Sequence, residues 1–258
     1  WGQYDKALIH YQRALRIKQE AGIKDNSAEL NNIANIYEQK GIYDKALEYY
    51  KQALNIAEEA NAFSNYGTMI INIMRVNAIL MDVDEFLIYV DKYLQLDNQA
   101  VQITNHVQFN IEAGSMYRVY EIYETALEFY NTALELSNTH NYRQSAKEAL
   151  NGIGITYMDM DEYGKAIPYL LDAVDILEDL RKTASGNTRR DYVSAQFSVY
   201  EHLYRSYSKI KDFKNVYNTV ELSRAKLFSE RLAGIDSLVV IPDLSTVQSA
   251  LSSNQAII

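Results

Sequence analysis

The stretch GQYDKALIHYQRAL (residues 2–15) returns almost unchanged as GIYDKALEYYKQAL (residues 41–54). An internal match at a fixed offset is the sequence signature of a repeat architecture. When the small residue inside each copy is aligned, successive copies lie 39, 40, 40, 40 and 50 residues apart. The aligned positions are Ala7, Ala46, Phe86, Ala126, Ala166 and Val216. The sequence therefore predicts an array of similar units.

Each copy has the pattern of a pair of helices. Between residues 26 and 40, apolar and small residues recur three or four positions apart, which is the spacing of one helix face. Gly41 ends this helix, and Asp44 lies early in the next one, where an acidic side chain suits the helix dipole. One pair cannot bury its apolar face, but stacked pairs can. We predict an all-α solenoid of antiparallel helix pairs, with eleven main helices and no sheet.

The repeated positions resemble the tetratricopeptide repeat (TPR). The resemblance is carried by three sets: Leu30, Ile33, Ala34, Tyr37, Ala46, Tyr50 and Ala53; Gly114, Tyr117, Ala126, Tyr130 and Ala133; and Leu150, Ile153, Gly154, Tyr157, Ala166, Leu170 and Ala173. It implies a right-handed superhelix. The usual repeat is ~34 residues, so a 40-residue step implies longer helices, similar to kinesin light chains and bacterial peptide-sensing regulators. The copy at residues 82–97 departs from the pattern, because Phe86 and Tyr93 replace alanines, and altered packing is expected there.

Composition excludes several function classes. A net charge of −9 and a pI near 5.0 argue against direct nucleic-acid binding, which needs a basic surface. No apolar run approaches the ~18 residues of a membrane span. The absence of cysteine excludes disulfides, thiolate metal sites and cysteine nucleophiles within these 258 residues. This composition suits the cytoplasm, which is the predicted location.

No catalytic, metal or cofactor site is evident from the sequence. The four histidines, His10, His106, His140 and His202, lie in distant copies with no pair at metal-ligand spacing. Acidic pairs such as Glu58–Glu59 are typical of solvated helix faces, and the glycines match no phosphate-binding loop. We therefore expect no enzyme in this chain, and we look for its function on a binding surface.

The TPR resemblance places the binding surface on the inner side, along the first helix of each pair. The residues that it assigns to a protein or peptide partner are Asn31, Asn32, Asn35, Asn72, Arg75, Glu112, Arg118, Asn151, Glu201 and Arg205. Asparagine amides can donate to and accept from an extended backbone, and arginines can pair with carboxylates. These side chains are expected to point away from the helix interfaces. The alternative is that they are only solvated polar residues.

The two ends suggest a piece of a longer protein. Residues 1–2 enter in the middle of a repeat, and we expect residues 1–234 to form the solenoid, as a half repeat followed by five helix pairs. We expect a loop at residues 183–188 (TASGNT) to explain most of the ten extra residues before Val216, and a long helix at 189–211. Residues 235–258 are interpreted as a connector and the start of another domain.

The predicted final helix contains Ser223, Arg224, Ala225 and Leu227, and a β-prone connector separates it from Leu244, Ser245, Gln248 and Leu251, which an apolar run follows. This order resembles the junction of bacterial proteins in which TPR repeats precede a CHAT domain, a caspase-like protease module. The resemblance implies that the final helix couples the repeats to the protease in cis. The coupling residues would be Arg224, Leu227, Phe228 and Leu232. The protease histidine and cysteine would lie beyond Ile258.

Two functions stay open at this point. The first is a protein- or peptide-binding scaffold that regulates a CHAT protease, with a bacterial defence complex such as a CRISPR effector as one conceivable partner. The second is a cytoplasmic peptide-responsive regulator or adaptor without a protease.

Overall fold

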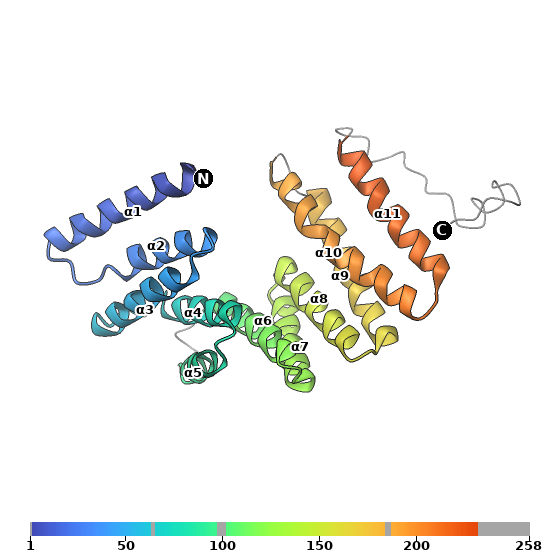
Figure 1. The fold of residues 1–258 in the computed structure, drawn as a ribbon, viewed down its shortest axis with the longest axis horizontal. Helices are drawn as coiled ribbons and strands as arrows, with labels where there is room; N and C mark the ends of the chain where they lie inside the picture. Colours follow the sequence, from blue (N-terminus) through green and yellow to red (C-terminus); the bar gives the residue numbers. More distant parts are fainter. Residues whose placement is uncertain (1, 63–64, 97–101, 184–186, 232–258) are drawn as a thin grey trace, which may run out of the picture. The chain divides into compact units, whose positions relative to one another are not determined.

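The computed structural model describes residues 2–62, 65–96, 102–183 and 187–231 (Figure 1). This part of the chain contains eleven α-helices and no strand. They are α1 (Gly2–Glu20), α2 (Ser27–Gln39), α3 (Tyr43–Glu59), α4 (Tyr66–Leu80), α5 (Val83–Leu94), α6 (Ile103–Val119), α7 (Tyr123–Thr139), α8 (Arg143–Asp159), α9 (Tyr163–Thr183), α10 (Asn187–Lys209) and α11 (Phe213–Arg231). The chain divides into two compact units, Trp1–Met116 and Tyr117–Ile258, and each is described by itself.

Left-handed residues follow eight of the helices. They are Gly22, Gly41, Asn61, Met81, Glu121, Asn141, Asp161 and Lys211. At Gly41 the backbone N–H donates to Glu38 O at 2.8 Å, and the next N–H donates to Tyr37 O at 2.9 Å, which is the Schellman motif. The same pair of bonds follows α6, α7 and α8. Each turn reverses the chain, so that the two helices of a pair lie side by side.

Alanines and stacked aromatic rings hold each pair together. Ala46, Ala126 and Ala166 are fully buried, which allows close approach of the neighbouring helix. The ring of Tyr37 on α2 stacks on Tyr49 of α3, with centroids 5.4 Å apart. Equivalent stacks join Tyr117 to Phe129 and Tyr157 to Tyr169. The prediction of an all-helical repeat fold is confirmed.

The copy that lacks the alanines packs in a different way. Helix α5 has 12 residues, whereas α3 and α7 have 17. Phe86 and Tyr93 are both buried, and the Tyr93 ring stacks on Phe109 of α6 with a centroid distance of 4.0 Å. In this pair, large side chains fill the space between the helices. In the other pairs, alanines at these positions let the helix backbones approach closely.

The prediction of a loop at residues 183–188 is wrong for Thr183, Asn187 and Thr188, which are helical. Helix α9 has 21 residues against 17 in α7, and α10 has 23 against 17 in α8. Four extra residues in one helix and six in the other account for the ten-residue insertion. Residues 184–186 lie outside the described part of the chain. The long helix expected at 189–211 is α10.

The residues predicted to couple the solenoid to a following domain cannot be placed. Arg224, Leu227 and Phe228 belong to α11, but their side chains lie outside what the structure describes. Leu232 and residues 235–258 also fall outside the described residues.

Candidate functional site

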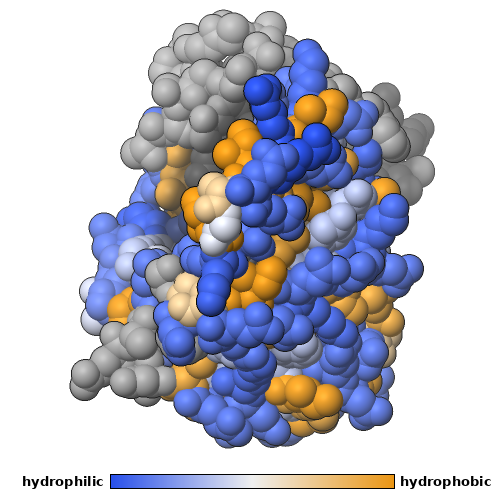
Figure 2. All heavy atoms as spheres, turned by 90° about the vertical axis from the view of Figure 1, so that its left-hand side faces the viewer, coloured by the Kyte–Doolittle hydropathy of each residue, from blue (hydrophilic) through white to orange (hydrophobic). Residues whose placement is uncertain are grey.

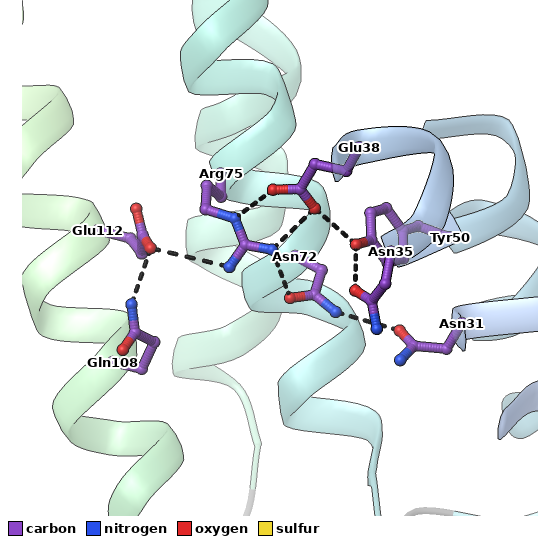
Figure 3. Close-up of polar contacts among 8 residues, drawn as sticks. All are labelled: Asn31, Asn35, Glu38, Tyr50, Asn72, Arg75, Gln108 and Glu112. Atoms are coloured by element: carbon purple, nitrogen blue, oxygen red, sulfur yellow. Dashed lines mark hydrogen bonds and ion pairs between the residues drawn. The ribbon is translucent and has the colours of Figure 1, made fainter. Parts of the chain in front are cut away.

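Polar side chains from three first helices meet on one surface of the N-terminal unit (Figure 3). On α2, Asn31, Asn35 and Glu38 are four and then three residues apart, a spacing that puts them on one helix face. Asn72 and Arg75 stand three apart on α4 by the same rule. Gln108 and Glu112 stand four apart on α6. Together with Tyr50 of α3, these residues are called the inner network.

Arg75 is the centre of the inner network. Its Nε donates to Glu38 Oε1 at 2.7 Å, and its Nη2 donates to Glu38 Oε2 at 2.9 Å, which makes a bidentate ion pair between α4 and α2. Nη2 also donates to Asn72 Oδ1 at 3.0 Å. On the other side, Nη1 lies 4.0 Å from Glu112 Oε1, and this oxygen accepts from Gln108 at 2.8 Å. One guanidinium therefore links three first helices.

Amides and a buried tyrosine complete the network. The Asn72 amide donates to Asn31 Oδ1 at 3.1 Å, which joins α4 to α2 a second time. Asn72 is only 6% exposed. The hydroxyl of Tyr50, a fully buried residue, lies within hydrogen-bond distance of Asn35 Oδ1 and of Glu38 Oε2, the latter at 2.6 Å. Through Tyr50, the second helix α3 thus contacts two residues of the network on α2.

The electrostatics of the inner network favour the ionised pair. Burial alone would raise the pKa of Glu38, but hydrogen bonds from Arg75 and Tyr50 outweigh it, so the pKa lies below its usual value. Burial opposes the charge of Arg75, yet Glu38 raises the pKa of the guanidinium above its ordinary value. Burial and Glu38 both raise the pKa of Tyr50. Glu38 and Arg75 are therefore charged at neutral pH, and Tyr50 is a hydroxyl donor.

A second polar group lies in the C-terminal unit, on α6, α8 and α10. Arg118 donates to Asp159 Oδ2 at 2.7 Å, and His202 Nδ1 lies 3.0 Å from Asn151 Oδ1. Glu201 and Arg205 form an ion pair one turn apart on α10. Burial lowers the pKa of His202. The neutral imidazole, with Nδ1–H as donor, satisfies the asparagine oxygen.

The structure brings the predicted residues into these two groups, one in each unit. Asn31, Asn35, Asn72, Arg75 and Glu112 belong to the inner network, whereas Arg118, Asn151, Glu201 and Arg205 belong to the second group. Asn32 has no polar side-chain contact among the described residues.

Two expectations change. Asn72 and Arg75 join helices, so they do not point away from the interfaces. Each predicted arginine already has a carboxylate partner within the chain: Glu38 for Arg75, Asp159 for Arg118, and Glu201 for Arg205.

Sequence reasoning missed five members of these groups: Glu38, Tyr50, Gln108, His202 and Asp159. A signal was present for three of them. Glu38 follows Asn35 by three residues and Gln108 precedes Glu112 by four, so each shares the helix face of a predicted residue. Asp159 follows Arg118 by 41 residues, the same separation as that of Asn72 from Asn31. No comparable signal connects His202 to Asn151, because the insertion in α9 and α10 changes the repeat step.

Neither polar group has the composition of a metal centre. No cluster of three histidine or acidic side chains suited to a metal ion occurs where side chains are described. The same part of the chain has no helix with the length and apolar character needed to cross a bilayer. The chemistry available on both surfaces is hydrogen bonding by amides and pairing of charges.

Comparisons with known proteins support the repeat fold. Tetratricopeptide repeat models match residues 2–59 and residues 147–178. No curated protein matches the sequence significantly.

Among solved structures, BtubC (BKLC) from P. vanneervenii is similar, with a TM-score of 0.73 and 16% identity over 93% of this chain and 98% of that one. A putative kinesin light chain from Podosopora anserina with TPR-like repeats has a TM-score of 0.61 and 13% identity, over 82% and 99% of the two chains. The quorum sensor NprR from B. thuringiensis has a TM-score of 0.59 and 13% identity, over 86% and 71%. At these identities the likeness concerns the fold. The chain contains tetratricopeptide repeats in a TPR-like helical repeat fold.

Proposed function

We propose that this chain is a protein- or peptide-binding scaffold whose partner lies along the first helices. The proposal rests on amide N–H donors on α2, in and beside the inner network, that are not used within the described part of the chain. The side chain of Asn32 and the Nδ2 atoms of Asn31 and Asn35 have no hydrogen-bond partner among the described residues. These amides lie beside a rigid, charged framework on α2. They can donate to the carbonyl groups of an extended backbone.

The pairing of the arginines defines how the partner is recognised. Because Arg75, Arg118 and Arg205 are neutralised within the chain, recognition of ligand carboxylates is not their main role. They hold neighbouring first helices, or adjacent turns of one helix, in place. The amides then present fixed donors at low entropic cost, which is how preorganised sites gain affinity.

The comparisons support a binding role at the level of the fold. TPR repeats match two segments of the chain, and the similar structure NprR is described as a quorum sensor. We extend this role to signalling: partner binding on the first helices is relayed through α11 to a C-terminal caspase-like CHAT protease in the bacterial cytoplasm. Arg224, Leu227, Phe228 and Leu232 would form the coupling segment. A CRISPR effector is a conceivable partner in this scheme. The second candidate is a peptide-responsive regulator or adaptor without a protease.

The test begins with peptides selected on the full chain from a random displayed library. Binding of a selected peptide is then measured by calorimetry for the Asn32→Ala variant and for the double variant Asn31→Ala, Asn35→Ala. Loss of buried hydrogen bonds predicts a cost of ~1–3 kcal/mol for the double variant. Asn131→Ala is the control, because Asn131 is an exposed asparagine on the second helix α7. Its affinity should equal that of the parent chain.

The opposite pattern would contradict the proposal. If Asn131→Ala weakens binding while the α2 variants keep full affinity and normal helicity, the partner lies on the second helices. For the signalling extension, full-length protein with substitutions at Leu227 and Phe228 should bind normally but lose ligand-stimulated proteolysis. A full-length protein without peptidase activity at any ligand concentration would leave the adaptor function as the correct one.

A further inference from the structure

Helix α5 carries apolar side chains both on its buried side and on its exposed surface. Its inner side carries Phe86, Val90 and Tyr93, which are 1%, 3% and 3% exposed. Its outer side carries Leu87, Ile88 and Leu94, which are 40%, 62% and 60% exposed. A surface helix normally has one apolar stripe toward the core and a polar opposite face. Exposed apolar residues also interrupt the mostly polar face that Figure 2 shows, but α5 places three of them on one short helix.

Two equivalent helices do not share this feature. The repeat alignment puts Ile88 at the position of Glu48 on α3 and Glu128 on α7, and both glutamates are exposed. Leu94 corresponds to Leu54, which is 1% exposed on α3. On α1 the position of Ile88 is apolar and exposed as well, because Ile9 occupies it. The outer apolar side therefore distinguishes α5 from α3 and α7.

Two acidic residues flank the exposed apolar side chains. Asp84 and Asp91 stand three or four positions from Leu87 and Ile88, so all four share one helix face. Both aspartates are exposed, and neither makes an ion pair within the described chain. The neighbouring acid Glu85, in contrast, is paired with Lys51 of α3. The residues Asp84, Leu87, Ile88, Asp91 and Leu94 are called the outer α5 face.

We propose that the outer α5 face docks a cationic amphipathic helix of another protein. An aliphatic ridge on the partner would cover Leu87, Ile88 and Leu94, as in other helix-on-helix contacts. Lysine or arginine beside that ridge would pair with Asp84 and Asp91. Burying the apolar area supplies the attraction, and the unpaired carboxylates select the charge of the partner. This surface lies on a second helix and is separate from the inner network.

Two other candidates for binding to the outer α5 face are disfavoured by their charge. A second copy of this chain would set aspartates against aspartates, and each copy carries a net charge of −9. The C-terminal residues 232–258 contain two aspartates and no lysine or arginine, so they cannot supply the cations. A cationic amphipathic helix can cover the apolar residues of the outer α5 face and also pair with its two aspartates.

The probe is a synthetic amphipathic helical peptide of leucine and lysine, used with the full chain. A peptide of the same composition in scrambled order, which forms no apolar face, is the reference. Ile88→Glu introduces the residue that α3 and α7 carry at this position, so the variant should fold. Its affinity for the amphipathic peptide should fall about tenfold, since burial of an isoleucine is worth roughly that ratio. Asp84→Asn with Asp91→Asn should weaken binding severalfold at low salt and less at high salt.

Ile9→Glu is the matched control. Ile9 occupies the same repeat position on α1 and is 63% exposed, close to the 62% of Ile88. The proposal requires that Ile9→Glu binds the peptide as the parent does and that the scrambled peptide binds more weakly. Equal loss in both glutamate variants, or no loss in Ile88→Glu, would overturn it. Sedimentation showing a dimer that Ile88→Glu dissociates would also overturn it, in favour of a second copy.

Discussion

Arg75 on α4 and Glu38 on α2 form a bidentate ion pair with donor–acceptor distances of 2.7 and 2.9 Å. The two residues are 37 positions apart in sequence, and their ion pair joins the first helices of neighbouring repeats. Since Tyr50 donates to the same carboxylate, one glutamate links three helices. The side chains of the inner network therefore also connect the helices that carry them.

This ion pair should contribute more to stability than an exposed one. A double-mutant cycle with Glu38→Gln and Arg75→Met, followed by urea unfolding, should give a coupling of ~1–3 kcal/mol. The comparison cycle uses Glu201→Gln and Arg205→Met, whose side chains are 41% and 58% exposed. Exposed pairs couple by less than ~1 kcal/mol. Equal couplings in the two cycles would contradict the structural role of Glu38.

Acid should weaken the C-terminal unit through His202. Burial lowers its pKa below the ordinary 6.5, while Glu201 and Asp159 act in the opposite direction to Arg205 and Arg118. The unfolded chain therefore takes up the proton first. The stability that the neutral ring contributes is present above pH 6.5 and is lost as the pH falls through the lower folded value.

The measurement is the free energy of unfolding from about pH 7.5 to 5.5, above the ordinary carboxylate range. His202→Gln retains a donor for Asn151 and should flatten the decline. His140→Gln, at an exposed turn, is the comparison variant. A slope that persists in His202→Gln would show that other groups cause it.

Gly152 should not tolerate a methyl group. A Cβ at this position would lie 2.3 Å from the Tyr130 ring, which is 3% exposed. Gly152→Ala should therefore destabilise the chain by ~1–3 kcal/mol, as overpacking does. At Gly164 on α9, a Cβ would meet nothing within 4 Å, so Gly164→Ala should raise stability by up to ~1 kcal/mol through helix propensity. Thermal unfolding of both variants checks the contrast in sign.

Asn77 is a site where an apolar residue should stabilise the fold. It occupies the place of the stacked tyrosines Tyr37, Tyr117 and Tyr157, but it is fully buried with no partner for either amide atom among the described residues. Asn77→Leu should raise the free energy of unfolding by ~1–3 kcal/mol, since an unsatisfied amide is lost. Asn72→Leu is the counterpart, and it should lower stability because Asn72 is hydrogen-bonded on both sides. Destabilisation by Asn77→Leu would indicate a hidden polar partner.

The left-handed turns should respond to glycine in a predictable direction. Gly41 has φ of 72° with nothing near its Cβ position, so Gly41→Ala should cost about 1 kcal/mol from backbone strain alone. Met81 holds the equivalent turn with φ of 58°, and Met81→Gly should relieve that strain by a fraction of this amount. Thermal midpoints moving in opposite directions would agree. A fall with Met81→Gly would mean that its side chain stabilises the turn.

Much of the architecture is predictable because it depends on short-range rules. The spacing of Ala46, Ala126 and Ala166 indicates the repeat length, and the breaker Gly41 marks the helix boundary. These features act within one helix pair, where residue order and distance in space are closely related. The loop prediction is wrong at Thr183, Asn187 and Thr188 because threonine and asparagine are only weak helix breakers.

The inner network contains contacts that the sequence alone does not predict. The repeat register selected Asn31, Asn72 and Arg75 correctly as neighbours on one side of the array. It could not show that Glu38 neutralises Arg75, or that Tyr50 reaches the same carboxylate from α3, because these contacts depend on the rotation and spacing of packed helices. The sequence by itself determined the repeat register and the helix face on which each polar residue stands. Only the tertiary structure decided which of them hydrogen-bond within the chain and which amide donors have no partner among the described residues, since that depends on distances of a few ångströms between side chains from different helices.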